Sequence, residues 1–580
     1  MKKITSLFLL LVFAMAGHAK SEPRDVSSIR SEPCSLAGVD PKVRCGSLQV
    51  WENRHTRRGR KIAIHFLVFP AVHRATSDPL VYIAGGPGAS SIDDATSWAE
   101  QFRELRDTRD ILFVDMRGSG RSHPLNCDVW GPELRGYMGD YLPAARVQRC
   151  ADELSAQADL RQYTTDNSVD DLDDVRAALG YDRLNLLGTS YGTRYALAYL
   201  RRHPGHSRTA ILQAVVPTDL KTPYTYAADA ERALDGVLAE CDRDPPCRAA
   251  FPQIRNDLDA ALAKLAKGSV EVTIRHPETG EALTVPLSRD LFAEAVRGML
   301  YQPSSASGIP TLLHQAAGGD FAPAAEWALV NSRYHLAKGA SLGLYLSITC
   351  AEDVPFFPEQ EGIRRAKGSF LGASRVVPQK AACRVWPSRP VSRSFLKPVV
   401  SDAPVLMVTG QWDPVTPPRT SAEALVTLKN ATRLIVPSGG HDFGGVPGAW
   451  ECITPIMIQA IRSGSAKSLD TSCVNALERG HFPVAALPSA WSNAPTEDVR
   501  PYVGAFEAPG AKFIETKLID ARLHLMLDGQ DLLLAPISPA RFAIIGWPFQ
   551  YVEFARVRGA VTALIWQPLG EPTMAYARRK

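Results

Sequence analysis

The sequence lacks the features that mark several large classes of protein. It has no Cys-x-x-Cys pair and no histidine spacing suited to zinc, so neither a metal nor a cofactor is expected. It has no long basic stripe, and its net charge is only +4 over 580 residues, so nucleic acid is not an implied partner. Apolar residues make up 45% and charged residues 22%, which is typical of a globular protein with a large core.

Long apolar runs are also absent, with one short exception at the N-terminus. Lys2 and Lys3 precede the apolar stretch Leu7 to Ala16, which is too short to span a bilayer comfortably. Small residues follow, and cleavage after Ala19 would make residues 1–19 a secretory signal peptide; an uncleaved anchor is the alternative. No cysteine lies near the cut, so the prediction is a periplasmic or secreted protein without a stable membrane anchor.

What is present includes ten cysteines, an even number that favours disulfides in an exported chain. Connectivity cannot be deduced from spacing alone, so pairing of near neighbours is a hypothesis. Each such loop is short, and each bridge would add roughly 2–4 kcal/mol of stability. The expected pairs are Cys34–Cys45, Cys127–Cys150, Cys241–Cys247, Cys350–Cys383 and Cys452–Cys473.

Short apolar segments alternate with helical patterns and glycine-rich turns over residues 34–216 and 403–487. This alternation predicts an α/β fold with a parallel, doubly wound sheet, in which ligands bind at the carboxyl ends of the strands. A helix is expected over Leu172 to Leu179, capped by residues 168–171. The expected strands are 46–52, 61–69, 80–84, 111–115, 184–187, 209–216, 404–409 and 432–436.

Two other regions depart from this pattern. Residues 217–402 contain amphipathic helical segments, including Ala227–Cys241 and Ile254–Lys267, and predict a helical insertion placed as a lid over the site. Residues 498–580 contain short alternating segments punctuated by Gly and Pro, which predict a small antiparallel β-barrel or sandwich.

The pattern Gly-x-Ser-x-Gly occurs twice. The copy around Ser190 follows an apolar strand and precedes a helix, so its serine would lie at the apex of a sharp turn, exposed to a base. The copy around Ser341 follows a helical segment, and Ser341 is interpreted as structural. Ser190 is therefore the candidate nucleophile.

A serine nucleophile needs a base, and the base needs an acid to orient it. Asp413 follows the predicted strand 404–409, and His441 follows the next strand, in the chain order Ser, Asp, His. Alone, Asp413 would be read as a turn residue and His441 as a surface histidine, but together they predict a triad. His481 is the competing base and follows a helical stretch.

Backbone amides are expected to stabilise the oxyanion that attack would create. The amide of Tyr191 is one candidate, and Gly86 in the loop Gly85-Gly86-Pro87-Gly88 is the other, with Gly85 as the alternative. The segment Asp115 to Ser122 lacks the lysine and the spacing of a phosphate-binding loop and is interpreted as a structural loop beside the site.

Taken together, these motifs resemble those of the bacterial α/β-hydrolase peptidases of the tripeptidyl and prolyl aminopeptidase type, over roughly Cys34 to Cys473. Ala84 stands where the prolyl enzymes usually carry His, which favours the tripeptidyl branch. The resemblance implies an α/β-hydrolase fold and a metal-free serine exopeptidase acting on the free N-termini of peptide substrates.

An exopeptidase must bind an α-ammonium group, and a carboxylate in the insertion could do so. Glu352 is the first candidate and Asp353 the second; a pair of surface acids is an equal alternative. An esterase with the same triad, or a binding protein without catalysis, would be compatible with the same fold.

Overall fold

The computed structural model describes residues 30–34, 43–487, 498–509, 513–527, 530–570 and 573–579. The predicted signal peptide therefore lies outside the described residues. In the described ranges, no helix has the length and apolarity needed to cross a membrane.

A nine-stranded sheet forms the centre of the larger part of the chain, in the order β1-β2-β3-β5-β4-β6-β7-β10-β11. β1 to β3 are antiparallel, β3 pairs antiparallel with β5, and the rest are parallel, as the alternating sequence pattern predicts. The strand bounds are β1 (Arg30–Pro33), β2 (Arg44–Trp51), β3 (Lys61–Phe69), β4 (Leu80–Ile83), β5 (Ile111–Val114), β6 (Leu184–Thr189), β7 (Ser207–Gln213), β10 (Val405–Gly410) and β11 (Ala431–Val436).

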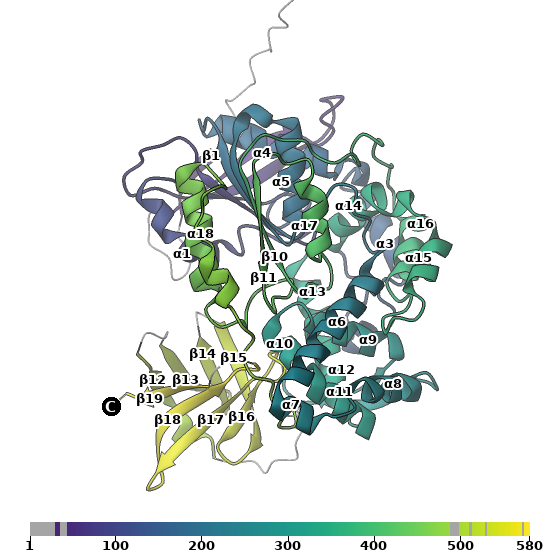
Figure 1. Cartoon of the computed structure of the whole chain (residues 1–580), viewed down its shortest axis with the longest axis vertical. Coiled ribbons are helices and arrows are strands. Elements are labelled where there is room, and N and C mark those ends of the chain that lie inside the picture. Colours follow the sequence, from purple (N-terminus) through teal and green to yellow (C-terminus); the bar gives the residue numbers. More distant parts are fainter. Residues whose placement is uncertain are drawn as a thin grey trace, which may run out of the picture.

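Consecutive strand residues point to opposite sides of the sheet, so these apolar strands have buried side chains on both faces. Helices cover both faces. In β5, Leu112 belongs to the same core cluster as residues of α4 and α5, whereas Phe113 belongs to the cluster on the other face, with α1 and α18. Figure 1 shows this layering. The bounds are α1 (Ala95–Gln101), α4 (Thr165–Ala178), α5 (Tyr191–Arg202), α17 (Pro418–Leu425) and α18 (Ala449–Ser463).

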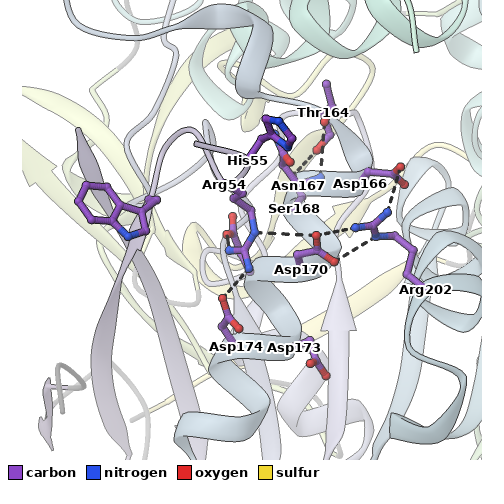
Figure 2. A network of polar contacts seen from close by, with 12 residues as sticks. Arg54, His55, Thr164, Asp166, Asn167, Ser168, Asp170, Asp173, Asp174 and Arg202 are labelled. Atoms are coloured by element: carbon purple, nitrogen blue, oxygen red, sulfur yellow. Dashed lines mark hydrogen bonds and ion pairs between the residues drawn. The ribbon is translucent and has the colours of Figure 1, made fainter. Parts of the chain in front are cut away.

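The start of α4 differs from the prediction. The helix begins at Thr165, and the side chain of Thr164 caps it by accepting a hydrogen bond from the amide of Asn167. Residues 168–171 therefore lie inside the helix, where Asp170 and Asp171 form ion pairs and do not cap it. Arg54, in the loop after β2, contacts Asp170, Asp171 and Asp174, and Arg202 of α5 also bonds Asp170 (Figure 2).

The segment between β7 and β10 is mainly helical, as predicted, but it also contains a β-hairpin that the sequence analysis missed. The hairpin consists of β8 (Val270–Arg275) and β9 (Ala282–Leu287). The helices that matter below are α6 (Tyr226–Arg243), α7 (Pro245–Ala250), α9 (Arg289–Met299), α12 (Ala322–Leu329), α14 (Leu342–Glu352), α15 (Glu359–Ala366) and α16 (Val376–Val385). We call residues 217–402 the insertion.

The C-terminal strands form a closed antiparallel barrel, one of the two architectures predicted for this region. Its core combines aliphatic side chains with aromatic ones, among them Tyr502, Phe506 and Phe554. The barrel packs against the insertion, where Trp327 stacks on Phe549 with ring centroids 5.5 Å apart (Figure 1). Its strands are β12 (Gly504–Glu507), β13 (Ile514–Ile519), β14 (Arg522–Leu527), β15 (Gln530–Ser538), β16 (Arg541–Ile544), β17 (Tyr551–Val557), β18 (Ala560–Gln567) and β19 (Met574–Arg578).

The ten cysteines form five disulfides, and the pairs are those expected from the sequence. Two of the bridges lie in the insertion: Cys241–Cys247 links α6 to α7, and Cys350–Cys383 links α14 to α16. The other three are Cys34–Cys45, Cys127–Cys150 and Cys452–Cys473.

Candidate active site

Ser190 lies at the turn between β6 and α5. Its φ angle is 55°, in the left-handed region that a non-glycine side chain adopts only under constraint. A side chain on Gly188 would clash with the backbone of Gly192, and one on Gly192 would clash with the backbone of Ile83. The two glycines of the motif are therefore required by the close approach of strand, turn and helix.

Asp413 and His441 come from neighbouring strand ends, after β10 and β11, and meet there. His441 Nδ1 lies 2.9 Å from Asp413 Oδ2. Asp413 is fully buried, and its other oxygen accepts hydrogen bonds from the amides of Val415 and Thr416, each at 2.8 Å. The imidazole is thus held by a carboxylate that the loop itself fixes.

Thr416 is a residue of this site that the sequence analysis missed. Its hydroxyl donates to Asp413 Oδ2 at 2.6 Å and lies 3.3 Å from His441 Nδ1. Burial alone would raise the pKa of Asp413, but the charge of His441 and the hydrogen bonds from His441 and Thr416 outweigh it and lower that pKa. The carboxylate is therefore kept ionised, as an orienting partner of His441 must be.

The glycine loop after β4 approaches the same serine. A Cβ atom placed on Gly85 would lie 3.0 Å from Ser190 Cβ, and Gly86 has φ 109°, a conformation that disfavours any side chain. Tyr191 is the first residue of α5, where backbone amides have no partner within the helix. The amides of Gly86 and Tyr191 thus belong to two segments that meet at Ser190.

A small cavity opens beside Ser190, between the sheet and the insertion. Gly86, Ser190 and Thr416 line it from the sheet side. Tyr226, Thr349 and Asp353 line it from the insertion.

Of the two acids proposed to bind a substrate ammonium, Asp353 lines this cavity. It is paired with Arg194 Nη1 at 2.9 Å. Glu352 is fully buried and accepts hydrogen bonds from the amide and hydroxyl of Thr165, both at 2.7 Å. Burial is the main reason that the pKa of Glu352 rises to about 7, although Arg194 and Thr165 oppose the shift. Neither acid is a surface residue, so the alternative interpretation as a surface pair is wrong.

Three further features discussed in the sequence analysis are Ser341, the segment 115–122 and His481. Ser341 is buried and donates to Asn126 at 2.8 Å, in agreement with its interpretation as a structural serine. Asp115 accepts hydrogen bonds from Ser90 and from the amides of Ile92 and Arg121, so the segment 115–122 is a folded loop. His481 is exposed.

Comparison with protein families agrees with this geometry. A family described as the alpha/beta hydrolase fold matches residues 78–256, and a family described as TAP-like protein matches residues 369–473. The chain has the α/β-hydrolase fold and a segment that matches TAP-like proteins. The first match contains Ser190, and the second contains Asp413 and His441.

Named relatives of this α/β hydrolase include peptidases. The chain is 24% identical to serine protease Hip1 of Mycobacterium tuberculosis (strain ATCC 25618 / H37Rv) over 462 residues, 72% of this chain and 86% of Hip1. It is 28% identical to the tripeptidyl aminopeptidase of Streptomyces coelicolor over 223 residues, 35% of this chain and 41% of that protein. It is 27% identical to the proline iminopeptidase of Xylella fastidiosa over 151 residues, 26% of this chain and 36% of that protein.

Proposed function

We propose that this α/β hydrolase is a serine peptidase that releases residues or short peptides from free N-termini. The observation that carries the proposal is that Ser190 shares a pocket lining with Thr416, whose hydroxyl contacts both Asp413 and His441. Ser190 occupies a strained turn after β6, and the hydrogen-bonded pair Asp413–His441 follows β10 and β11. The peptidases among the relatives support the choice of substrate class.

In the proposed reaction, Ser190 Oγ attacks the scissile carbonyl while His441 Nε2 removes its proton. Asp413 holds Nδ1 of His441 and stabilises the imidazolium that forms. The amides of Tyr191 and Gly86 donate to the oxyanion, a contribution of about 3–4 kcal/mol per donor in comparable enzymes. His441 then returns the proton to the leaving amine, and water hydrolyses the acyl-enzyme in a second cycle.

The restriction to free N-termini is proposed on the basis of Asp353. Its carboxylate lines the cavity that contains Ser190 and can accept from an α-ammonium group. Arg194 neutralises one carboxylate, so the buried pair Glu352 and Asp353 can present a second negative charge when both are ionised. An N-acetylated peptide offers no cation to this position.

We also propose that the protein acts in the periplasm or outside the cell. The five disulfides support this location, because such bridges persist in oxidising compartments.

The test compares peptides with free and acetylated N-termini, using mass spectrometry to identify the products. The wild-type protein should release N-terminal fragments from the free peptides and fail on the acetylated ones, and Ser190→Ala should cleave neither. Equal cleavage of acetylated peptides would contradict the exopeptidase assignment. Hydrolysis of esters without cleavage of any peptide would identify an esterase instead.

A further inference from the structure

Three arginines of the insertion gather around a single glutamate beside the active-site cavity. Glu294 Oε2 accepts from Arg297 Nε at 3.1 Å and from Arg375 Nη1 at 3.2 Å. Arg333 completes the group, which we call the arginine cluster: Glu294, Arg297, Arg333 and Arg375. Its members are between 2% and 7% exposed, so nearly all of this charge is buried.

The cluster carries more positive charge than its own carboxylate can neutralise. Glu294 forms ion pairs with Arg297 and Arg375, but Arg333 forms no ion pair within the ranges that the structure describes. Burial, together with the neighbouring Arg375 and Arg297, lowers the pKa of Arg333 to about 10, although Glu294 opposes the shift. All three guanidinium groups thus remain charged near neutral pH, and a buried charge is costly unless an anion compensates it.

Hydrogen-bonding capacity in the cluster is also unused. The Nε atoms of Arg333 and Arg375 are buried and have no hydrogen-bond partner among the described residues, and the same is true of Glu294 Oε1. Arginine has five donors in a planar fork that matches a carboxylate. The cluster therefore offers both uncompensated charge and free donors.

Aromatic rings hold these planar groups in fixed orientations. Tyr141, from the loop before α3 (Ala144–Ser155), contacts two of them: its ring centroid is 3.6 Å from Arg375 Cζ and 4.8 Å from Arg333 Cζ. Arg333 also lies 5.5 Å from the ring of Trp130. Such packing reduces the conformational freedom that binding a ligand would otherwise remove.

Arg333 occupies an unusual backbone position. It belongs to the π-helical turn η4 (Val330–Tyr334), which interrupts the run between α12 and α13 (His335–Gly339). Single π-helical turns inside helices occur frequently at functional sites. Here the turn carries the one guanidinium of the cluster that lacks an ion pair in the described chain.

Two tyrosines connect the cluster to the active site. Tyr226 lines the cavity beside Ser190, and its ring lies 5.6 Å from Arg297 Cζ and 5.7 Å from Arg375 Cζ. Tyr301 accepts a hydrogen bond from Arg297 at 3.0 Å and contacts the imidazole of His441 edge-on, with centroids 5.0 Å apart. One side of the cluster therefore borders the residues that surround the scissile bond in the proposed reaction.

We propose that the arginine cluster binds a carboxylate of the peptide substrate, with Arg333 as its principal donor. This inference rests on the proposed peptidase function and specifies its substrate class: peptides with an anionic group within reach of the Ser190 cavity. The carboxylate has two possible sources, the C-terminus of a short peptide or an acidic side chain. Either would pair with Arg333 and leave Glu294 with its present partners.

The test measures kcat/KM for matched peptides. One pair is tetra-alanine as the free acid and as the C-terminal amide; the other contains Glu or Gln at an internal position, both with amidated C-termini. Wild-type protein should prefer the carboxylate member of at least one pair by about tenfold or more, as expected for a charge-assisted, bidentate contact. The pair that shows the preference identifies the source of the carboxylate.

Arg333→Gln should remove that preference while hydrolysis of the amide peptides continues, and Arg333→Lys should restore part of it. Arg364→Gln, an exposed arginine of α15, removes the same charge elsewhere on the insertion and should leave the preference intact. If the ratio of kcat/KM for the acid and amide peptides is the same in Arg333→Gln as in wild type, the proposal is overturned. The arginine cluster would then have only a packing role.

Binding provides a second readout that needs neither catalysis nor a folded Arg333 variant. The Ser190→Ala protein is titrated with the same peptides by calorimetry, and the acid should bind at least about tenfold more tightly than the amide. Equal affinities would overturn the proposal. If wild-type protein hydrolyses no peptide but this preference appears, the proposed function fails and the carboxylate site stands.

Discussion

At the residue scale, the proposed catalytic side chains are held by their immediate surroundings, Ser190 by a strained turn and His441 by its hydrogen bond to Asp413. Residues such as Ser190, whose neighbours in sequence are also neighbours in space, are the ones that the sequence predicts best. Ser190 was identified from a strand, a turn and a helix that are contiguous, and the structure gives it the strained turn that the glycines permit. Thr416 was missed although it lies three residues after Asp413, because a threonine after Asp-Pro-Val has no distinctive pattern. The surroundings of Glu352 could not be predicted, since Thr165 and Arg194 reach it from helices far away in sequence.

Glu352 leads to a prediction about pH. Its pKa in the folded protein is raised to about 7, mainly by burial, whereas an unfolded glutamate titrates near pH 4.3. Between these values the folded state binds more protons than the unfolded state, so the free energy of unfolding falls as pH rises from about 4.5 to 7. Glutamine cannot ionise, so Glu352→Gln should remove this decrease in the free energy of unfolding, which amounts to about 3 kcal/mol.

The measurement is urea unfolding of wild-type and Glu352→Gln protein at pH 5 and pH 8. The variant should gain stability relative to wild type as pH rises. Glu281→Gln, at an exposed position, is the control for removing a negative charge. The same pH dependence in wild type and Glu352→Gln would show that Glu352 is not the titrating group.

At the element scale, strands and barrel followed the sequence pattern, and the errors arose where two patterns compete. The hairpin β8–β9 lies between amphipathic helices, and its strands alternate too briefly to be distinguished from a helix end. The sequence predicts a helix cap at residues 168–171, but these residues lie inside α4, where Asp170 and Asp171 pair with Arg54 from the loop after β2.

The two disulfides of the insertion form a matched pair for a stability test. Cys350–Cys383 closes a loop of 33 residues and Cys241–Cys247 one of 6. The chain-entropy relation assigns them roughly 3.7 and 2.2 kcal/mol of stabilisation. Replacing both cysteines of the longer loop by alanine should therefore cost more, as measured by urea unfolding.

That substitution should also affect the reaction. Cys350 lies on α14 beside Thr349, which lines the cavity, so loosening α14 should raise KM for peptides. Breaking Cys241–Cys247, which joins α6 and α7 at the end of α6 away from Tyr226, should leave KM nearly unchanged. Equal effects of the two replacements on KM would contradict this role for the longer bridge.

At the scale of the whole molecule, the proposed site combines the sheet and the insertion. The sequence predicts these regions separately but does not predict how they contact one another. The strand ends of the sheet carry the proposed triad Ser190, Asp413 and His441, and Tyr226 and Asp353 of the insertion line the cavity beside Ser190. The barrel contacts the insertion through Trp327 and Phe549 and through Arg275, which donates to the carbonyl of Pro536. These contacts join segments more than 200 residues apart, and no local pattern predicts such pairs.

The central claim is that Ser190 is the nucleophile of this assembly, and the second Gly-x-Ser-x-Gly copy provides an internal comparison. The protein is treated with a fluorophosphonate, digested and mapped by mass spectrometry. The account predicts a single adduct on Ser190 that is lost in Ser190→Ala, because in the described part of the chain Ser190 alone combines a strained backbone with a place in the cavity lining. An adduct on Ser341, or an unmodified Ser190 in folded protein, would contradict it.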